Sequence, residues 1–181
     1  MALRNIVTEG DPVLSKRCRT VTDFNKRLHQ LIDDMRETLL DADGVGLAAP
    51  QVGVLRRVVL VLDTTKEDIP PEEQLIELIN PEVAAQSGEQ IGPEGCLSIP
   101  GVYGIVKRPD LVKINAQDRY GKPFEIWGSA LTARAFCHEI NHLDGILFRA
   151  LAEKILTPEE LDELVNLEEE EESYDEHKNV L

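Results

Sequence analysis

The chain has 181 residues, 42% of them hydrophobic, so it is long enough for one globular domain with a buried core. Its 19 lysines and arginines face 34 aspartates and glutamates, and the formal net charge of −15 argues against direct binding to nucleic acid. No apolar run approaches the roughly 20 residues of a membrane span, so a membrane protein is excluded as well.

The N-terminal residues Met1–Asn5 do not begin the apolar core of a signal peptide, and we expect a cytoplasmic protein. The cysteines are Cys18, Cys96 and Cys137, an odd and sparse set that does not make a disulfide framework.

The N-terminal part of the chain is irregular at first and then helical. After a turn at Asp11-Pro12, apolar residues recur with a helical period and predict a helix from about Thr22 to Leu40. The next segment, Gly44–Gly53, contains two closely spaced glycines but lacks the features of a phosphate-binding loop. Gln51 is polar within this apolar bend, so we expect its side chain to have a hydrogen-bond partner.

The middle of the chain is rich in strand patterns. A polar loop over 64–73 separates the first two strands, Asn80-Pro81 ends the second, and Tyr120-Gly121 marks a turn between the last two. The predicted strands are 58–62, 75–79, 83–90, 102–107, 111–116 and 124–127. A helix, then strands, then a further helix indicates an α+β fold with mostly antiparallel sheets around that later helix.

That later helix contains His138-Glu139-Ile140-Asn141-His142, which reads H-E-x-x-H. Ser129 can cap the start of the helix, and Gly145 stands where a helix commonly ends. The two histidines are one turn apart and share a face, so both imidazoles can bind one metal ion. Glu139 is rotated by about 100° from His138, which is where a general base for a metal-activated water would stand.

Cys96 is the best candidate for a third ligand, because a catalytic zinc-type site uses three protein ligands and keeps one position open. It is the one cysteine that lies in a glycine-punctuated loop, Glu94–Pro100. Cys137 neighbours His138 but points off the metal face, so we interpret it as a core residue.

The C-terminal part begins with a helix start at Thr157-Pro158, where threonine can cap the helix and proline can occupy its first position. Five consecutive glutamates, Glu168–Glu172, then open an acidic tail that we expect to be disordered. We therefore predict one domain over 1–167 and a tail over 168–181.

Three separated motifs together resemble those of the peptide deformylase family. They are Gly44–Gln51, Glu94–Ser98 and His138–His142, in this order, and the likeness spans roughly residues 1 to 165. The family pattern often has aspartate where this chain has Asn141, and we expect a change beside the site rather than in it.

The resemblance implies a hydrolase that removes the N-formyl group from the formyl-methionine of new polypeptides and releases formate. Cys96, His138 and His142 would hold one divalent ion, most often Fe²⁺ in this family, with Zn²⁺, Ni²⁺ or Co²⁺ able to substitute. A metal-bound water, activated by Glu139, would attack the formyl carbon, while the Gln51 side-chain amide and the Leu97 backbone N–H stabilise the developing oxyanion.

The resemblance also implies how the substrate binds. The peptide would lie along the backbone at Val45, Gly46 and Gly95 as an added strand. Its methionine would enter a pocket that includes Leu131, Arg134 and Ala135, with the arginine contributing its aliphatic stem. The partners expected are nascent formyl-methionyl polypeptides and, transiently, the ribosome, without direct nucleic-acid binding and without a membrane.

Two other functions are compatible with parts of the sequence. A zinc peptidase of the extended H-E-x-x-H type needs a third histidine where this chain has Phe148, and its other version needs a downstream glutamate such as Glu160 or Glu163. A structural zinc module needs a fourth protein ligand, for which only His29 and His177 remain among the histidines. The zinc-peptidase interpretation leaves Cys96 and Gln51 without a role.

Overall fold

The computed structural model describes residues 2–66, 68–164 and 166. The acidic tail predicted over 168–181 lies outside these residues. None of the helices in the described part of the chain has the length and apolar character needed to cross a membrane.

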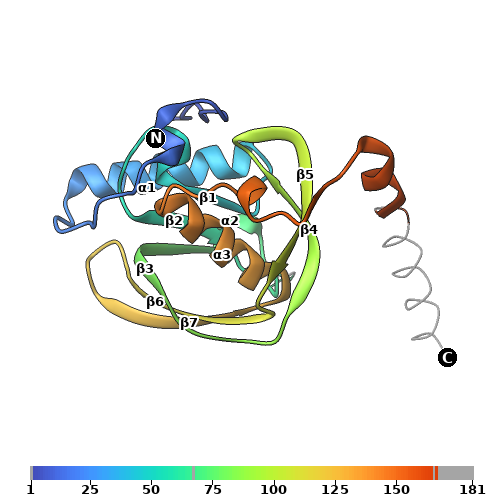
Figure 1. The fold of residues 1–181 in the computed structure, drawn as a ribbon. Coiled ribbons are helices and arrows are strands. Elements are labelled where there is room, and N and C mark those ends of the chain that lie inside the picture. Colours follow the sequence, from blue (N-terminus) through green and yellow to red (C-terminus); the bar gives the residue numbers. More distant parts are fainter. Residues whose placement is uncertain (1, 67, 165, 167–181) are drawn as a thin grey trace.

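The fold is α+β, as predicted, with two antiparallel sheets arranged around one helix (Figure 1). The larger sheet has five strands in the order β1-β2-β3-β6-β7, and the smaller has three in the order β4-β5-β8. The strands are β1 (Gly46–Ala48), β2 (Val58–Leu62), β3 (Leu75–Ser87), β4 (Gln90–Cys96), β5 (Ile99–Arg108), β6 (Leu111–Gln117), β7 (Pro123–Ser129) and β8 (Lys154–Ile155). The helices are α1 (Lys26–Asp41), α2 (Pro71–Gln74) and α3 (Ala130–Leu143), with 3-10 turns η1 (Pro12–Ser15), η2 (Ala49–Val52) and η3 (Phe148–Ala150).

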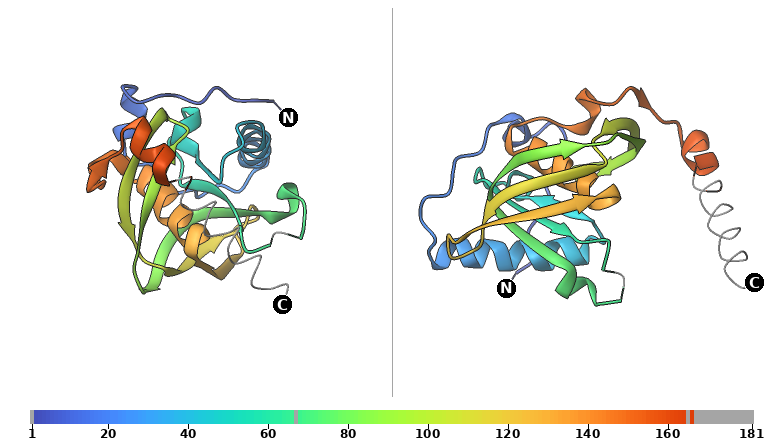
Figure 2. Two further views of the ribbon diagram at one scale, coloured as in Figure 1. Left: turned by 90° about the vertical axis from the view of Figure 1, so that its right-hand side faces the viewer. Right: turned by 90° about the horizontal axis from the view of Figure 1, so that it is seen from below.

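Strand β2 is buried on both faces, which explains its uninterrupted apolar sequence. Val58 and Leu60 belong to the apolar cluster under α1, whereas Val59 and Val61 belong to the cluster under α3. Side chains alternate between the two faces of a strand, so one run of aliphatic residues serves both cores. The helices α1 and α3 therefore lie on opposite sides of β1 and β2, as Figures 1 and 2 show.

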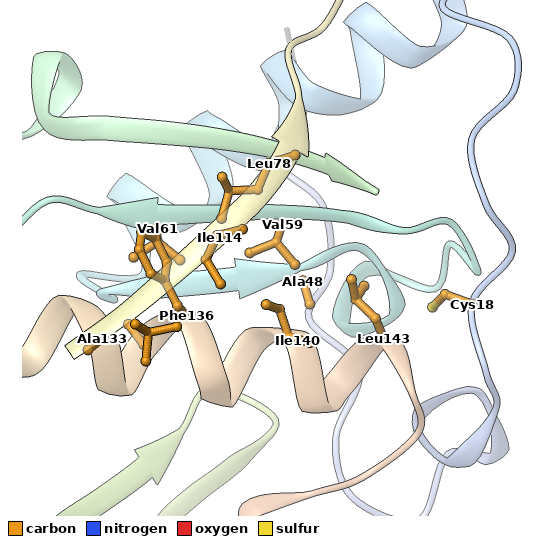
Figure 3. Close-up of a cluster of buried hydrophobic side chains, with 13 residues drawn as sticks. Cys18, Ala48, Val59, Val61, Leu78, Ile114, Ala133, Phe136, Ile140 and Leu143 are labelled. Carbon is orange, nitrogen blue, oxygen red and sulfur yellow. The ribbon is translucent and has the colours of Figure 1, made fainter. Parts of the chain in front are cut away.

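Helix α3 is the centre of the fold because it packs against strands of the larger sheet and also contacts β5. Ala133, Phe136, Ile140 and Leu143 recur at helical spacing and point toward the larger sheet (Figure 3). Figure 2 shows from two further sides that the strands enclose this helix. The opposite face of α3 is thus directed away from this core, and that face carries His138 and His142.

Several predicted limits were wrong, and strand β4 was not predicted at all. The strand predicted over 83–90 spans the end of β3 and the turn at Gly88, and the segment Glu94–Pro100, interpreted as a loop, lies largely in β4 and β5. Helix α1 begins at Lys26 rather than near Thr22, because the Asn25 side chain accepts hydrogen bonds from the N–H groups of Arg27 and Leu28 and caps the helix there. Strand β3 does not stop at Asn80-Pro81 but continues to Ser87 through a shift in register. Asn80 has a positive φ of 51°, so the backbone bends at the register shift and the strand continues beyond it.

The C-terminal helix starts as predicted and covers 158–164 and 166 among the described residues. Thr157 and Glu160 form a reciprocal capping pair, with the Glu160 N–H donating to Thr157 Oγ1 and the Thr157 N–H donating to Glu160 Oε2. Leu161 and Leu164 of this helix are only half-buried and lie outside the apolar clusters. β8 leads the chain along the outer side of β5, and the helix stands away from the body of the fold (Figure 1).

Phe136 should be essential for stability because its ring is fully buried between α3 and the larger sheet. Phe136→Ala is expected to lower the free energy of unfolding by about 3–5 kcal/mol, measured by denaturant unfolding of metal-free protein. Ile91→Ala is the control, because Ile91 is 59% exposed and a surface change alters stability by about 0.5 kcal/mol or less. Equal losses in the two variants would contradict the assignment of the core.

Candidate active site and metal centre

The three predicted ligands come together at one point. His138 and His142 are both buried and lie one turn apart on the face of α3 opposite its apolar core face, and Cys96 lies at the end of β4. The Cys96 Sγ atom is 3.3 Å from His142 Nε2, and one ligand atom from each of the three residues lies within 4.8 Å of the others. The tertiary structure thus brings a thiol from one sheet to two imidazoles on the central helix.

This donor set fits a divalent metal ion. One sulfur and two imidazole nitrogens are ligands typical of zinc and also suit iron, and three protein ligands leave a coordination position open for catalysis. Among the described residues, Glu139 Oε2 and His142 Nδ1 are the buried side-chain atoms without a hydrogen-bond partner. Glu139 Oε2 thus has no hydrogen-bond partner in the described part of the chain.

Glu94 anchors one of the histidines, a role that the sequence did not predict. Its carboxylate is buried, and its Oε2 atom lies 3.0 Å from His138 Nδ1. Arg108 donates to both carboxylate oxygens, with distances of 2.7 and 2.9 Å. Because Nδ1 is engaged with Glu94, the other ring nitrogen of His138 is the one available to a metal ion.

The surroundings of the two histidines shift their pKa values in opposite directions. Burial lowers the pKa of His138, but hydrogen bonds with Cys96 and Glu94 and the charge of Glu139 outweigh it and raise the pKa to about 10. For His142, burial and the nearby charge of His138 lower the pKa to about 3. A metal ion binds neutral imidazoles, so metal binding and protonation compete at these two side chains.

Glu139 has the properties of a general acid and base. Burial raises the pKa of its carboxyl group to about 7, although the charge of His138 acts in the opposite direction. The carboxylate lies directly against β1: a Cβ atom at Gly46 would come within 2.5 Å of Glu139 Oε1. Glycine at position 46 is therefore required for this approach, and a pKa near neutrality suits proton transfer in both directions.

The Gln51 side chain is fixed by hydrogen bonds at both ends of its amide. Its Oε1 accepts from the Ala48 N–H at 2.8 Å, so the amide nitrogen is oriented toward the site. That nitrogen donates to Ser98 Oγ at 3.3 Å and lies 3.6 Å from Cys96 Sγ. The expectation that Gln51 has a hydrogen-bond partner is confirmed, and its N–H group is preorganised beside the three ligands.

A cavity of about 580 Å³ adjoins the ligands and is bounded by the free edges of both sheets. β1 is an edge strand of the larger sheet and β4 of the smaller one, and both contribute to the cavity wall. The predicted substrate-binding residues all line it: Val45, Gly46, Gly95, Leu131, Arg134 and Ala135. Leu97 also lines it, and within the described chain its N–H, in the turn after β4, donates to no protein acceptor.

The structure also shows the surroundings of Asn141 and Phe148, two positions that the sequence analysis singled out. Asn141 Oδ1 accepts a 2.6 Å hydrogen bond from Arg108, so this position contacts the arginine that holds Glu94. Phe148 occupies the position where an extended zinc-peptidase motif has its third histidine, and its ring stacks on His138 with centroids 6.0 Å apart. Glu94 itself stands in the motif beside Gly95 and Cys96, a signal that could have identified it.

Comparisons with known proteins agree on one family. A family model described as polypeptide deformylase matches residues 3–155. A curated peptide deformylase of Lachnoclostridium phytofermentans is 52% identical over 172 residues, covering 95% of this chain and 99% of the relative. A crystal structure of a peptide deformylase from Legionella pneumophila superposes with a TM-score of 0.76 at 39% identity, covering 92% of this chain and 98% of that one. The structure from Thermotoga maritima gives a TM-score of 0.77 at 35% identity, covering 84% and 99%.

Replacing the thiol should weaken the metal centre. Cys96→Ser is expected to lower metal content and metal affinity, because a neutral hydroxyl is a poorer ligand than a thiolate. Metal content is measured by elemental analysis after dialysis against a weak chelator. Cys137→Ser is the control, since Cys137 is half-buried and packs against the apolar cluster under α3. Full metal occupancy in Cys96→Ser would refute its assignment as a ligand.

Proposed function

The chain belongs to the peptide deformylase family, metal-dependent hydrolases that remove the formyl group from formyl-methionine peptides, and from this premise we propose roles for its site residues. The observation that carries them is the convergence of Cys96, His138 and His142 within 4.8 Å, beside a buried carboxylate without a partner among the described residues. These three residues would hold the ion. When bound, a divalent ion supplies Lewis-acid activation of water and of the formyl carbonyl.

Glu139 moves the proton in the proposed mechanism. Its carboxylate takes a proton from the attacking water as the new carbon–oxygen bond forms at the formyl carbon. The same carboxyl group then gives the proton to the leaving amine as the carbon–nitrogen bond breaks, which yields formate and a free N-terminus. A pKa of about 7 supports both steps, because neither protonation state is strongly disfavoured near neutral pH.

Gln51 and Leu97 stabilise the negative charge that develops on the formyl oxygen. The Gln51 amide is held in place through its own oxygen by the Ala48 N–H, so its N–H donor needs no reorganisation during the reaction. The Leu97 backbone N–H is a second donor, since no protein acceptor in the described chain competes for it.

The peptide substrate binds as an added strand between the two sheets. Val45 and Gly46 offer the free edge of β1, and Gly95 offers the free edge of β4. Leu131 and Ala135, on the face of α3 that lines the cavity, accept the methionine side chain together with the stem of Arg134.

We also propose Fe²⁺ as the native ion, which is what the family resemblance implies. Zn²⁺, Ni²⁺ or Co²⁺ would be able to replace it, because a thiolate with two imidazoles suits each of these metals. The substrates are nascent formylated polypeptides, which places the enzyme in the cytoplasm and in transient contact with the ribosome. We assign catalysis to residues 1–167, because every residue used above precedes the acidic tail.

Removing the Glu139 carboxylate should stop proton transfer while the metal stays bound. Glu139→Ala is expected to lower kcat for release of formate from a formyl-Met peptide by at least about 10²–10⁴-fold, with metal content unchanged. Glu139→Gln provides a shape-matched version that keeps the packing against Gly46. Near-normal turnover by either variant with metal bound would exclude the proposed role.

Removing the Gln51 donor should affect the transition state. Gln51→Leu is expected to lower kcat by about 10²–10³-fold, the usual effect of losing one oxyanion donor, measured in metal-loaded enzyme. Gln74→Leu is the control, because Gln74 bonds the Ile69 carbonyl outside the cavity. An effect confined to KM would mean that Gln51 binds the substrate without stabilising the transition state.

A further inference from the structure

Arg134 lines the cavity, but its charged group is directed into the protein. The residue is 7% exposed, and its Nη1 atom donates to the carbonyls of Gly92 and Val106 at 3.2 and 3.0 Å. The same atom lies 3.1 Å from Glu94 Oε1, and Nε lies 3.3 Å from Gln90 Oε1. A buried guanidinium with partners on β4 and β5 ties α3 to the smaller sheet.

Both oxygens of the Glu94 carboxylate are contacted by side chains of helix α3. Arg134 and His138 stand at i and i+4 on α3, so both project toward the same region. Arg134 contacts Oε1 of Glu94 and His138 contacts Oε2, at 3.1 and 3.0 Å. Arg108 also contacts both oxygens, but it comes from β5, the neighbour of the strand that carries Glu94.

The two arginines therefore fix Glu94 with respect to different parts of the fold. Arg108 joins the carboxylate to its own sheet and reaches α3 only through Asn141, whereas Arg134 joins the carboxylate directly to the helix that carries both proposed histidine ligands. We propose that Arg134 is a positioning residue that acts through Glu94 to hold the His138 ring in its metal-binding orientation. This inference rests on the ligand assignment proposed above.

The physical reason is the orientation of the ring. A carboxylate that accepts from the outer nitrogen of a metal-bound histidine fixes the tautomer and the ring plane, and its loss typically costs 10–100-fold in metal affinity or activity. Without Arg134, Glu94 Oε1 loses its link to α3, and the carbonyls of Gly92 and Val106 lose a charged donor. The carboxylate can then shift with the sheet, and the His138 ring is less restrained.

The test is the rate at which metal-loaded full-length enzyme loses its ion to an excess of chelator. Arg134→Met keeps the length of the side chain without the guanidinium, and we expect metal loss to be about 10–100-fold faster. An unchanged rate of metal loss, or an effect on KM alone, would overturn the proposal and leave Arg134 as a pocket residue.

Arg119→Met is the matched control for a merely structural arginine. Arg119, in the turn between β6 and β7, holds Glu77 and Asp33 through its guanidinium and does not line the cavity. Arg119→Met should lower the melting temperature of the metal-free protein yet leave the rate of metal loss unchanged. Faster metal loss in this control, to the extent seen in Arg134→Met, would show that general loosening explains the effect and would overturn the proposal.

A double-mutant cycle with Glu94→Gln tests whether Arg134 affects metal binding through Glu94. If Arg134 acts through Glu94, adding Arg134→Met to Glu94→Gln accelerates metal loss by less than it does in the wild type. Fully multiplicative effects would overturn the proposal. Wild-type protein that binds no ion at Cys96, His138 and His142 would instead refute the ligand assignment.

Arg134→Lys keeps the test available if Arg134→Met does not fold. An ammonium group retains the charge but lacks the planar fork that lets one guanidinium serve the carboxylate and the strand carbonyls together. We expect metal loss at least about threefold faster than in the wild type, a smaller effect than the 10–100-fold expected of Arg134→Met. A wild-type rate would overturn the proposal.

Discussion

The proposed site depends on the hydrogen bonds that the buried Glu94 carboxylate accepts. This carboxylate accepts hydrogen bonds from Arg108, Arg134 and His138, which come from the smaller sheet and from the central helix. Burial raises the pKa of this carboxyl group, but the hydrogen bonds from Arg108 and His138 outweigh burial and hold the pKa at about 2. The group is therefore charged, and a charge in the interior is tolerated only when its partners are complete.

Both sheets contact the same helix, α3. One face of α3 is apolar and packs on the larger sheet, whereas the other carries the histidines toward the smaller sheet. The cavity lies where the free edges of β1 and β4 face this helix, so a peptide that adds to an edge strand would reach the proposed metal ligands directly. Close approach of Glu139 to β1 depends on the glycine at position 46.

Short-range patterns predicted most of the elements but not their limits. The apolar run at Val58–Leu62 is strand β2, and the amphipathic segment around Met35 is helix α1. The start of α1 differed because the Asn25 cap decides it, and β3 crosses Asn80-Pro81 because the bend is absorbed by a register shift. In both cases a local signal was present, but the surrounding structure decided between the conformations that the signal allows.

By itself the sequence determined the elements of the site that rest on local spacing. His138, Glu139 and His142 share a helix whose geometry fixes their relative positions, and the motifs around Gln51 and Cys96 identified the family. Only the tertiary structure decided which distant residues meet them. Glu94 and His138 are 44 positions apart, and Arg108 and Arg134 contact Glu94 from 14 and 40 positions away. Such contacts depend on the register of β4 against β5 and on the packing of α3, neither of which a local pattern of residues can specify.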